Sequence, residues 1–253
     1  MEIKKIAVRG GHTELCTGAS ALINELPEDR KVTVAVVKYL KKLGREALDV
    51  TPPVNYTSRS SEDLAYGVNK ANNWGADLFV SIHFNKAYDS YNGALGSEVC
   101  VYSTNEIAQR VVDALEELGF KNRGQKIRTG LYELKHTKMK AMIVETCFVE
   151  ATEDVALYRK LGADAIGKAI AEAIANKKVQ TVNTPANQSN SGAGYRVRIT
   201  ASVLNVRKGA GTKYSIATTV KRNEVYTIVE EKNGWGKLKS GAGWISLSYT
   251  TKL

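Results

Sequence analysis

Apolar residues in the first 177 positions recur in two patterns that alternate along the chain. Short, nearly continuous apolar runs predict buried β-strands. These runs are KIAVRGG, EALDVTPP, ADLFVSIHFN, GSEVCVYS and KAMIVETCFV. Apolar residues at helical spacing predict helices between them. These segments are PEDRKVTVAVVKYLKKLG, SSEDLAYGVNKANNWG, NEIAQRVVDALEELG and ATEDVALYRKLGADAIGKAIAEAIANK. Repeated strand–helix–strand units predict an α/β domain with a mainly parallel sheet flanked by helices.

The pattern changes in the last quarter of the chain. Residues 195–253 contain short β-rich runs separated by the turn signals KGAG, KRNE, KNGW and SGAG. Short strands at close spacing with such turns are typical of small all-β barrels. We therefore predict a second, all-β domain here.

Residues 178–194, KVQTVNTPANQSNSGAG, follow neither pattern. They are rich in Asn, Ser, Thr and Gly and contain no aromatic residue, Leu or Ile. A segment of this composition buries too little apolar surface to order itself. It is predicted to be a flexible linker between domains at residues 1–177 and 195–253, both of ordinary domain size.

The overall composition is that of a soluble globular protein, with 43% hydrophobic and 25% charged residues in a chain of 253. No run of about 18 apolar residues is present, so no membrane span is expected. The first residues, MEIKKIAV, lack the apolar core and cleavage site of a signal peptide, so we expect synthesis in a cytosol. Three widely spaced cysteines, Cys16, Cys100 and Cys147, are expected to be reduced thiols.

The positive charge of the chain is concentrated in its last domain. Residues 195–253 hold eleven Lys and Arg against three Glu, and therefore carry +8 of the net charge of +10. Such a domain favours a polyanionic partner. Nucleic acid, an acidic membrane surface and an anionic cell wall all fit this description.

Two of the three histidines lie where a parallel sheet binds its ligands. His12 directly follows the first predicted strand, and His83 lies near the carboxyl end of ADLFVSIHFN. In open α/β sheets, ligands bind outside the carboxyl ends of the strands. The two histidines can therefore meet in space although they are far apart in the sequence.

Two carboxylates occupy similar places. Glu25 stands at the start of the first predicted helix, and Glu145 lies inside the apolar run MIVETCF, where a lone charge would be costly. Two imidazoles and one carboxylate form a common catalytic Zn²⁺ site. A further carboxylate can then take a proton from the zinc-bound water. Spacing alone does not choose Glu25 over Glu14, Glu28 or Asp29.

Structural roles for the same residues are the alternative. A histidine on a strand is more often a satisfied core residue than a ligand, and a glutamate in an apolar strand is often half of a structural ion pair. No compact motif such as H-E-x-x-H is present. The residues by themselves leave both interpretations open.

Four segments, in this order and spacing, carry a family resemblance. They are IAVRGGH, INELPEDRKVTVAVVKYLKKLG, ADLFVSIHFN and AMIVETCFVEATED, and the third is the most specific. Together they resemble the zinc-dependent N-acetylmuramoyl-L-alanine amidase family (amidase type 3) of bacterial autolysins and phage endolysins. The resemblance covers residues 3–177 and implies the amidase type 3 fold.

The resemblance also implies a site. His12, Glu25 and His83 match the family's zinc ligands, and Glu145 matches its catalytic glutamate. The implied reaction is hydrolysis of the amide between N-acetylmuramic acid and L-alanine in peptidoglycan. One Zn²⁺ would polarise the carbonyl and activate its bound water, and Glu145 would accept the water's proton and pass it to the leaving amine.

Four other residues near these motifs are less clear. Arg9 stands where the family commonly has a small or acidic residue, and Lys140 stands where it often has proline. Asn85, two residues past His83, can orient substrate or water, or it can serve a structural turn. His136 either edges the cleft or is an ordinary surface histidine, and the second is favoured.

The segment LNVRKGAGTKYSIATTVKRNEVYTIVEEKNGWGKLK, with the later GWI, resembles the bacterial SH3-like cell-wall-binding module over residues 196–250. Trp235 and Trp244 either form a groove for glycan or peptide or close the barrel. The basic charge suits an anionic wall. Nucleic-acid binding is not expected, because no recognition helix or base-stacking pattern accompanies the charge.

These features predict a two-domain peptidoglycan amidase, most simply a phage or prophage endolysin acting on a Gram-positive wall after its release from the host cytoplasm. A host autolysin or spore-germination amidase would use the same chemistry. A catalytically silent wall-binding protein and a basic DNA-binding protein are the alternatives from other classes.

Overall fold

The computed structural model describes residues 3–179, 195–232 and 234–253 of the chain. Its contacts divide the chain into two compact units, Met1–Thr181 and Val182–Leu253. The predicted linker falls almost entirely on residues 180–194, outside the described residues, so it stays a prediction.

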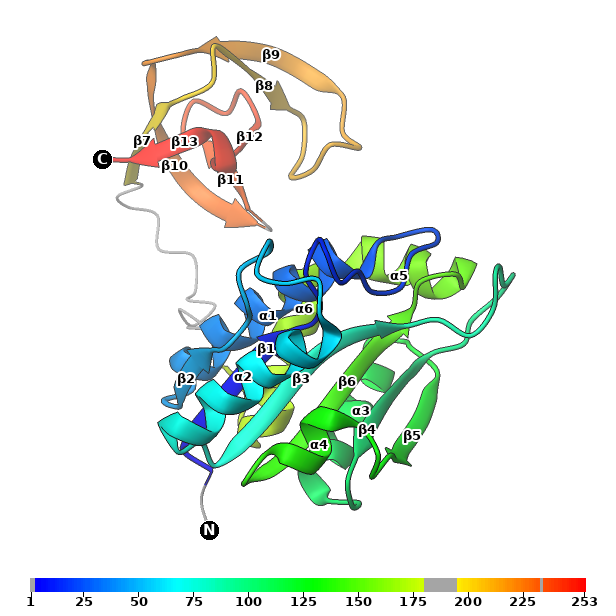
Figure 1. The fold of residues 1–253 in the computed structure, drawn as a ribbon. Coiled ribbons are helices and arrows are strands. Elements are labelled where there is room, and N and C mark those ends of the chain that lie inside the picture. The colour runs from blue at the N-terminus through cyan, green and yellow to red at the C-terminus, as the bar shows by residue number, and fades with distance from the viewer. Residues whose placement is uncertain (1–2, 180–194, 233) are drawn as a thin grey trace. The chain divides into compact units, whose positions relative to one another are not determined.

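The first unit is built on one six-stranded sheet with the order β2-β1-β3-β6-β4-β5 (Figure 1). The strands are β1 (Lys5–Gly10), β2 (Glu46–Asp49), β3 (Leu78–Asn85), β4 (Ser97–Val101), β5 (Asn122–Ile127) and β6 (Lys140–Phe148). Every neighbouring pair runs parallel except β4 and β6, which run antiparallel. The prediction of a mainly parallel sheet flanked by helices is confirmed.

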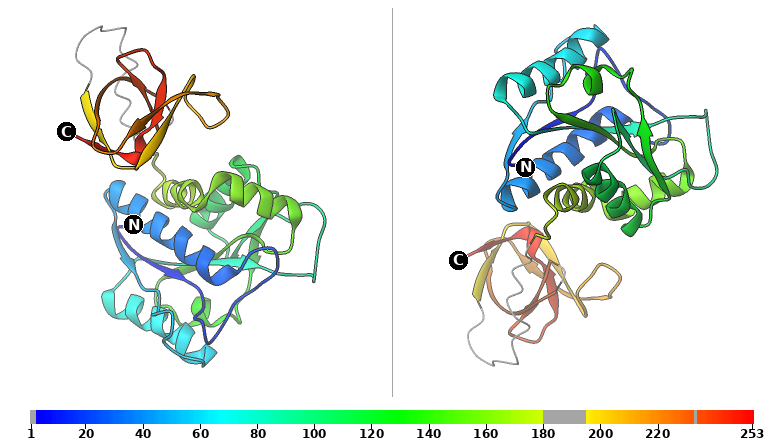
Figure 2. Two further views of the ribbon diagram at one scale, coloured as in Figure 1. Left: turned by 90° about the horizontal axis from the view of Figure 1, so that it is seen from above. Right: turned by 90° about the horizontal axis from the view of Figure 1, so that it is seen from below.

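Helices cover both faces of this sheet (Figure 2). They are α1 (Glu25–Lys42), α2 (Ser60–Trp74), α3 (Glu106–Glu117), α4 (Tyr132–His136), α5 (Thr152–Leu161) and α6 (Ala163–Ala175). The larger core lies beneath α1, α3, α5 and α6, and the smaller core lies beneath α2 and α4. In β1, Ile6 and Val8 face the larger core and Ala7 faces the smaller one. This double burial explains why the strands read as continuous apolar runs.

The structure divides one predicted helix and contains two elements that the sequence pattern does not show. The long closing helix is two helices, α5 and α6, because the chain breaks at Gly162, which has a φ of +77°. Strand β5 and helix α4 were not predicted. The sequence of β5, NRGQKI, is polar and only partly buried at the sheet edge, and α4 spans five residues, too few for a helical period to show.

Helix α1 presents Glu25 at the edge of the sheet. Its first turn carries Glu25 and Glu28, and negative charge is favourable at a helix N-terminus. Just beyond its last turn, Gly44 adopts a φ of +78°, a conformation that suits glycine and ends the helix. Glu25 is only 3% exposed, so the start of α1 points this side chain into the protein.

The second unit is a seven-stranded antiparallel sheet around a single core of apolar side chains that includes Val197, Val206 and Ile228. Its strands are β7 (Tyr195–Ile199), β8 (Val203–Arg207), β9 (Ile216–Lys221), β10 (Val225–Lys232), β11 (Trp235–Leu238), β12 (Trp244–Ser246) and β13 (Thr250–Lys252), with a short 3₁₀ turn at Leu247–Tyr249. The prediction of an all-β domain is confirmed.

Two further expectations concern the whole chain. Cys16, Cys100 and Cys147 are free thiols. Within the described ranges, no helix has both the length and the apolar character needed to cross a bilayer.

A buried carboxyl group in α1 gives a testable pH dependence of stability. Asp29 is fully buried, and neither of its carboxylate oxygens has a hydrogen-bond partner in the described parts of the chain. Burial raises the pKa of Asp29 to about 8, with His83 opposing and Glu25 adding to this effect. The folded metal-free protein therefore holds a proton that the unfolded chain releases from about pH 4 upward, and its stability falls as the pH rises towards 8.

Asp29→Asn removes this titration while keeping the shape of the side chain. We expect the variant to gain stability over the wild type by up to about 1.4 kcal/mol per pH unit as the pH rises from 4 to 8. Urea unfolding of both proteins in chelator, followed by helical circular dichroism, measures the difference. Parallel pH curves for the two proteins would show that Asp29 is not protonated in the fold.

Candidate metal centre

Three predicted ligands meet at the carboxyl edge of the sheet. His12 follows β1, Glu25 opens α1 and His83 lies near the end of β3. Oε1 of Glu25 lies 2.9 Å from Nδ1 of His83 and 3.3 Å from Nε2 of His12. The imidazole centroids are 5.0 Å apart with the rings nearly perpendicular. One ligand atom from each residue lies within 4.8 Å of the other two.

The backbone fixes the Glu25 carboxylate from both sides. The amide of Ala19 donates to Oε2 at 2.6 Å, and the amide of Phe84 donates to Oε1 at 2.9 Å. Of the rival carboxylates, Glu14 is exposed and Glu28 bonds to Tyr158 and Lys31. Asp29 lies beside Gly10 and Thr33. Glu25 is therefore the carboxylate that the structure brings to the two histidines.

His12 adopts an unusual backbone conformation. Its φ is +61°, the left-handed region that few residues other than glycine occupy. The Arg30 guanidinium supports this conformation, because Nη2 donates to the carbonyl oxygen of His12 at 2.7 Å. Strained residues of this kind cluster at functional sites, where the surrounding structure over-determines them.

Two glycines leave the space that the ligands fill. A Cβ on Gly11 would lie 2.5 Å from Cε1 of His83. A Cβ on Gly18 would lie 2.5 Å from Cδ2 of His12 and would overlap Oε2 of Glu25. Gly11, the second glycine after Arg9, thus leaves room for the ring of His83, and Gly18 leaves room for His12 and Glu25. We call the space bordered by these two glycines the cradle.

The geometry fits a zinc ion. Tetrahedral Zn²⁺ with bonds of about 2.0–2.2 Å places its ligand atoms roughly 3.4 Å apart. The 2.9 Å and 3.3 Å separations at Oε1 of Glu25 are close to this spacing. Two imidazoles and one carboxylate are also a donor set that catalytic zinc uses, with a position left for water.

The charges of these groups are tightly linked. Burial alone would raise the pKa of Glu25, but its hydrogen bonds to His12 and His83 outweigh burial and hold that pKa well below its usual range. Burial alone would lower the pKa of His83, but the hydrogen bond and charge of Glu25 raise it to about 9 in the metal-free protein. The carboxylate is thus ionised and ready to bind a cation.

Glu145 lies on the neighbouring strand directly opposite His83. The two residues are register partners in the parallel pairing of β3 with β6. A bulge follows this pair, so that Asn85 aligns with Phe148, and bulges of this kind re-aim side chains beside active sites. Oε2 of Glu145 is buried without a hydrogen-bond partner among the described residues. Burial raises the pKa of Glu145 to about 7, with His83 opposing this rise.

The sequence of this domain matches a known family. Residues 6–176 match the N-acetylmuramoyl-L-alanine amidase family, and residues 202–251 match the bacterial SH3 domain family. The chain belongs to the N-acetylmuramoyl-L-alanine amidases. The resemblance read from four sequence segments is confirmed.

Two relatives are similar to most of this chain. An uncharacterized protein of Clostridium perfringens, CPE1502, is 48% identical over 192 residues, which cover 74% of this chain and 56% of the relative. The chain thus spans little more than half of that protein. The N-acetylmuramoyl-L-alanine amidase CwlM of Bacillus licheniformis is 31% identical over 203 residues, which cover 78% of this chain and 75% of CwlM.

A solved structure supports the amidase fold. The catalytic domain of the CD27L endolysin, which targets Clostridia difficile, is 30% identical and superposes with a TM-score of 0.63. The match covers 69% of this chain and 98% of that domain.

The remaining predicted residues have structural contacts in the amidase domain. The side chain of Asn85 donates to Oε1 of Glu98 at 3.2 Å and accepts from the amide of Lys86. Nε of Arg123 donates to Oε2 of Glu98 at 2.7 Å. Asn85 therefore links the end of β3, which carries His83, to Glu98, the residue of β4 that pairs with Glu145. Its role towards substrate stays a prediction.

His136 and Arg9 are also placed. His136 ends α4 with its ring stacked on Tyr132, exposed and outside the three-residue cluster, as an ordinary surface histidine would be. Arg9 is fully buried and forms ion pairs with Asp63 and Glu133. Gly18 and Glu133, which no sequence motif marks, both lie against residues of the candidate metal cluster.

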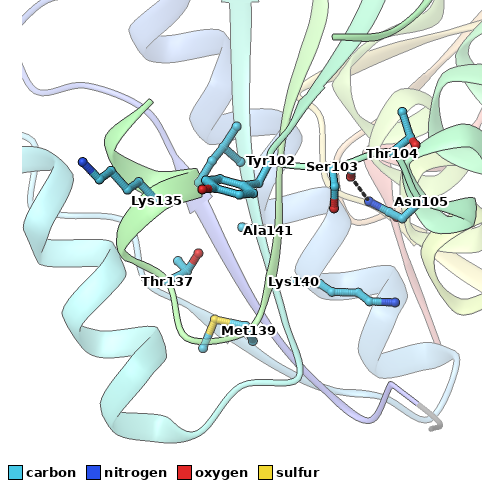
Figure 3. A pocket seen from close by; sticks show the side chains of 10 residues that line it. Tyr102, Ser103, Thr104, Asn105, Lys135, Thr137, Met139, Lys140 and Ala141 are labelled. Carbon is cyan, nitrogen blue, oxygen red and sulfur yellow. Dashed lines mark hydrogen bonds between the residues drawn. The ribbon is translucent and has the colours of Figure 1, made fainter. Parts of the chain in front are cut away.

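The amidase domain also has a cavity of about 560 Å³ at the end of the sheet where β6 begins (Figure 3). It is lined by Tyr102, which follows β4, and by Lys140 and Ala141, which begin β6. Because Lys140 pairs with Leu78 at the start of β3, this cavity lies at the strand ends opposite His83 and Glu145. It is therefore separate from the candidate metal centre.

Proposed function

We propose that this chain is a zinc-dependent N-acetylmuramoyl-L-alanine amidase that hydrolyses the amide between N-acetylmuramic acid and L-alanine in peptidoglycan. The observation that carries the proposal is the His12–Glu25–His83 cluster in a domain of the amidase family, with Glu145 on the adjacent strand. A structural ion pair is complete with one histidine and one carboxylate. The convergence of two imidazoles and a carboxylate beside the cradle of Gly11 and Gly18 favours a metal site instead.

His12, Glu25 and His83 would hold the zinc ion, as the donor set indicates. Zinc at this position supplies a Lewis acid for the amide carbonyl and lowers the pKa of a bound water towards about 7. Gly11 and Gly18 leave room for the three side chains. The amides of Ala19 and Phe84 hold the Glu25 carboxylate, so that the site is formed before substrate arrives.

Glu145 is the proton carrier in this proposal. Its buried Oε2 has no partner in the described ranges, so it is free to accept a hydrogen bond from the attacking water. A pKa of about 7 in the metal-free protein suits a group that takes a proton and then gives it to the leaving amine of L-alanine. The loss of that proton to the amine completes the cleavage of the C–N bond.

The test is digestion of purified walls followed by mass spectrometry of the released fragments. We expect free L-alanine amino termini, loss of this product after treatment with a chelator, and its return when zinc is added. New reducing sugar ends would instead identify a glycosidase. A protein that binds no zinc and stays inactive after zinc is added would be a catalytically silent wall-binding protein.

The SH3 domain is proposed to attach the enzyme to the wall. A groove of about 370 Å³ on this domain is lined by Leu204, Arg207, Trp235 and Tyr249, among others. Trp244 does not line this groove but lies beneath the Lys237 ammonium. Only Trp235 of the two tryptophans therefore contributes to the groove. The aromatic and basic lining suits a wall peptide or glycan with acidic groups.

Removing the second domain tests this attachment. Deleting residues 182–253 keeps Val179, whose amide bonds to Glu172 and whose side chain packs on the amidase core. We expect unchanged turnover of soluble muropeptides but weaker co-sedimentation with walls, and a loss of wall binding by the full chain as salt is raised. Equal wall binding by the truncated protein would contradict the proposed role, and a preference of the isolated domain for DNA would indicate a nucleic-acid module.

We further propose that the enzyme acts as an endolysin, since the CD27L endolysin domain shares its fold at 30% identity. A host autolysin or spore-germination amidase is the second candidate, because the amidase CwlM of B. licheniformis is equally similar. The neighbouring genes separate the two roles: a holin gene beside this one supports the endolysin, and sporulation genes contradict it.

A further inference from the structure

A buried charge network lies directly behind the metal centre. Arg9 on β1 is fully buried and contacts two carboxylates that are themselves 3% and 2% exposed. Its Nη2 lies 2.7 Å from Oδ1 of Asp63 on α2, and its Nη1 lies 3.0 Å from Oε1 of Glu133 on α4. A Cβ on Gly67 would lie 2.6 Å from Cδ of Arg9, so this glycine makes room for the arginine stem.

Only one of these carboxylates continues to a metal ligand. The hydroxyl of Ser81 on β3 donates to Oε1 of Glu133 at 3.1 Å. The same Ser81 oxygen lies 3.0 Å from Nε2 of His83, two residues along the strand. Oε2 of Glu133 lies 3.8 Å from that nitrogen. The line Arg9–Glu133–Ser81–His83 therefore ends on the ring nitrogen that faces away from Glu25.

The direction of these hydrogen bonds follows from the inventory of donors. A carboxylate can only accept, so the Ser81 proton points to Glu133. The Ser81 oxygen then accepts from Nε2–H of His83. When Nε2 carries the proton, the lone pair of the neutral ring is on Nδ1, which lies 2.9 Å from Oε1 of Glu25 on the metal side. Without Glu133, the Ser81 hydroxyl can turn and donate to Nε2, which moves the ring proton to the metal side.

We propose that Glu133, held by Arg9, is a positioning residue that fixes the ring orientation and tautomer of His83 through Ser81. Histidine ligands of metals commonly donate their second N–H to such an outer partner, and loss of the partner costs about 10- to 100-fold in metal affinity. The inference rests on the proposed metal centre. It also gives Arg9 a role, since the guanidinium neutralises and orients the buried Glu133 carboxylate.

Asp63 offers a matched control. Both Asp63 and Glu133 are buried carboxylates paired with Arg9, but only Glu133 bonds to Ser81. Glu133→Ala and Asp63→Ala each remove one carboxylate from the same arginine. Alanine is used because a glutamine at position 133 would keep an acceptor oxygen for the Ser81 hydroxyl. Zinc affinity of the full-length chain is measured by competition with a chromogenic chelator, and folding is checked by circular dichroism and urea unfolding.

We expect both variants to lose stability, but only Glu133→Ala to bind zinc more weakly, by about tenfold or more. Ser81→Ala leaves both ion pairs of Arg9 in place and removes the relay together with one long hydrogen bond of 3.5 Å from Nη1 of Arg9. It should therefore lower zinc affinity with a smaller loss of stability than Asp63→Ala. This variant keeps the test decisive if Glu133→Ala does not fold.

The outcomes separate this inference from the proposed function. If the wild type binds zinc while Glu133→Ala and Ser81→Ala bind it as tightly as Asp63→Ala, the positioning role is wrong and the metal centre stands. If the wild type binds no zinc, both are wrong. If the wild type and Asp63→Ala bind zinc tightly, the relay variants bind it weakly and none of these proteins cleaves walls, the positioning role holds and the amidase proposal fails.

Discussion

Replacing Glu145 with glutamine is expected to slow wall cleavage by about 10²- to 10⁴-fold while leaving zinc bound, because positioned proton transfer typically contributes this much to a rate. Glutamine keeps the shape of the side chain but cannot take a proton from the attacking water. Glu145 is the register partner of His83 and not a member of the three-residue cluster, so the ligands stay in place. Release of L-alanine amino termini and zinc content are measured on the same sample.

A second buried glutamate, near the carboxyl end of the same strand, is the control. Glu150 lies just beyond β6 and is 1% exposed, and its Oε1 accepts from the amides of Ala87 and Tyr88. Glu150→Gln also removes a buried negative charge but keeps that acceptor, so it should cleave walls at close to the normal rate. Near-normal turnover by Glu145→Gln would show that another group moves the proton.

Gly18→Ala is expected to destroy the proposed metal site although it replaces none of the three ligands. The added Cβ would overlap Oε2 of Glu25 and come within 2.5 Å of the His12 ring. Glu25 cannot retreat, because the amides of Ala19 and Phe84 hold its two oxygens. We expect zinc affinity to fall by more than about 100-fold, beyond the loss caused by removing an outer partner. Cleavage of walls should fall with it.

Gly130→Ala is the matched control for this prediction. A Cβ on Gly130 meets no atom within 4 Å, so the substitution adds the same methyl group in open space. Zinc affinity and turnover should match the wild type. If Gly18→Ala binds zinc as tightly as Gly130→Ala, zinc binding does not depend on the free space at Gly18.

Much of the fold can be read from the sequence because strands buried on both faces must be apolar. Strands β1, β3 and β6 carry side chains into two cores and appear as continuous apolar runs. Strand β5 is a polar edge strand and leaves no such signal. The direction of β4 is also invisible, since SEVCV is buried throughout and reads the same in a parallel or an antiparallel neighbour.

From the sequence, only those site residues can be predicted that stand at the ends of apolar strands. His12 and His83 follow from their places after apolar runs, but Glu25 has rivals that differ by a few positions. The choice depends on the amides of Ala19 and Phe84, which no local pattern encodes. The roles of Gly18 and Glu133 depend on contacts between segments far apart in the sequence. Arg9 looked like an anomaly because its partners Asp63 and Glu133 lie on helices that the sequence reading did not connect to it.

The antiparallel direction of β4 decides where the loop between β3 and β4 lies. A parallel neighbour would need a crossover that returns the chain to the far end of the sheet before the strand begins. Here the chain leaves β3 and enters β4 at the same end of the sheet, so residues 86–96 lie at the end where His83 stands. Tyr88 and Tyr91 stack on each other there with ring centroids 5.6 Å apart and are exposed. Since no crossover limits this loop, its length and composition can change without disturbing the sheet.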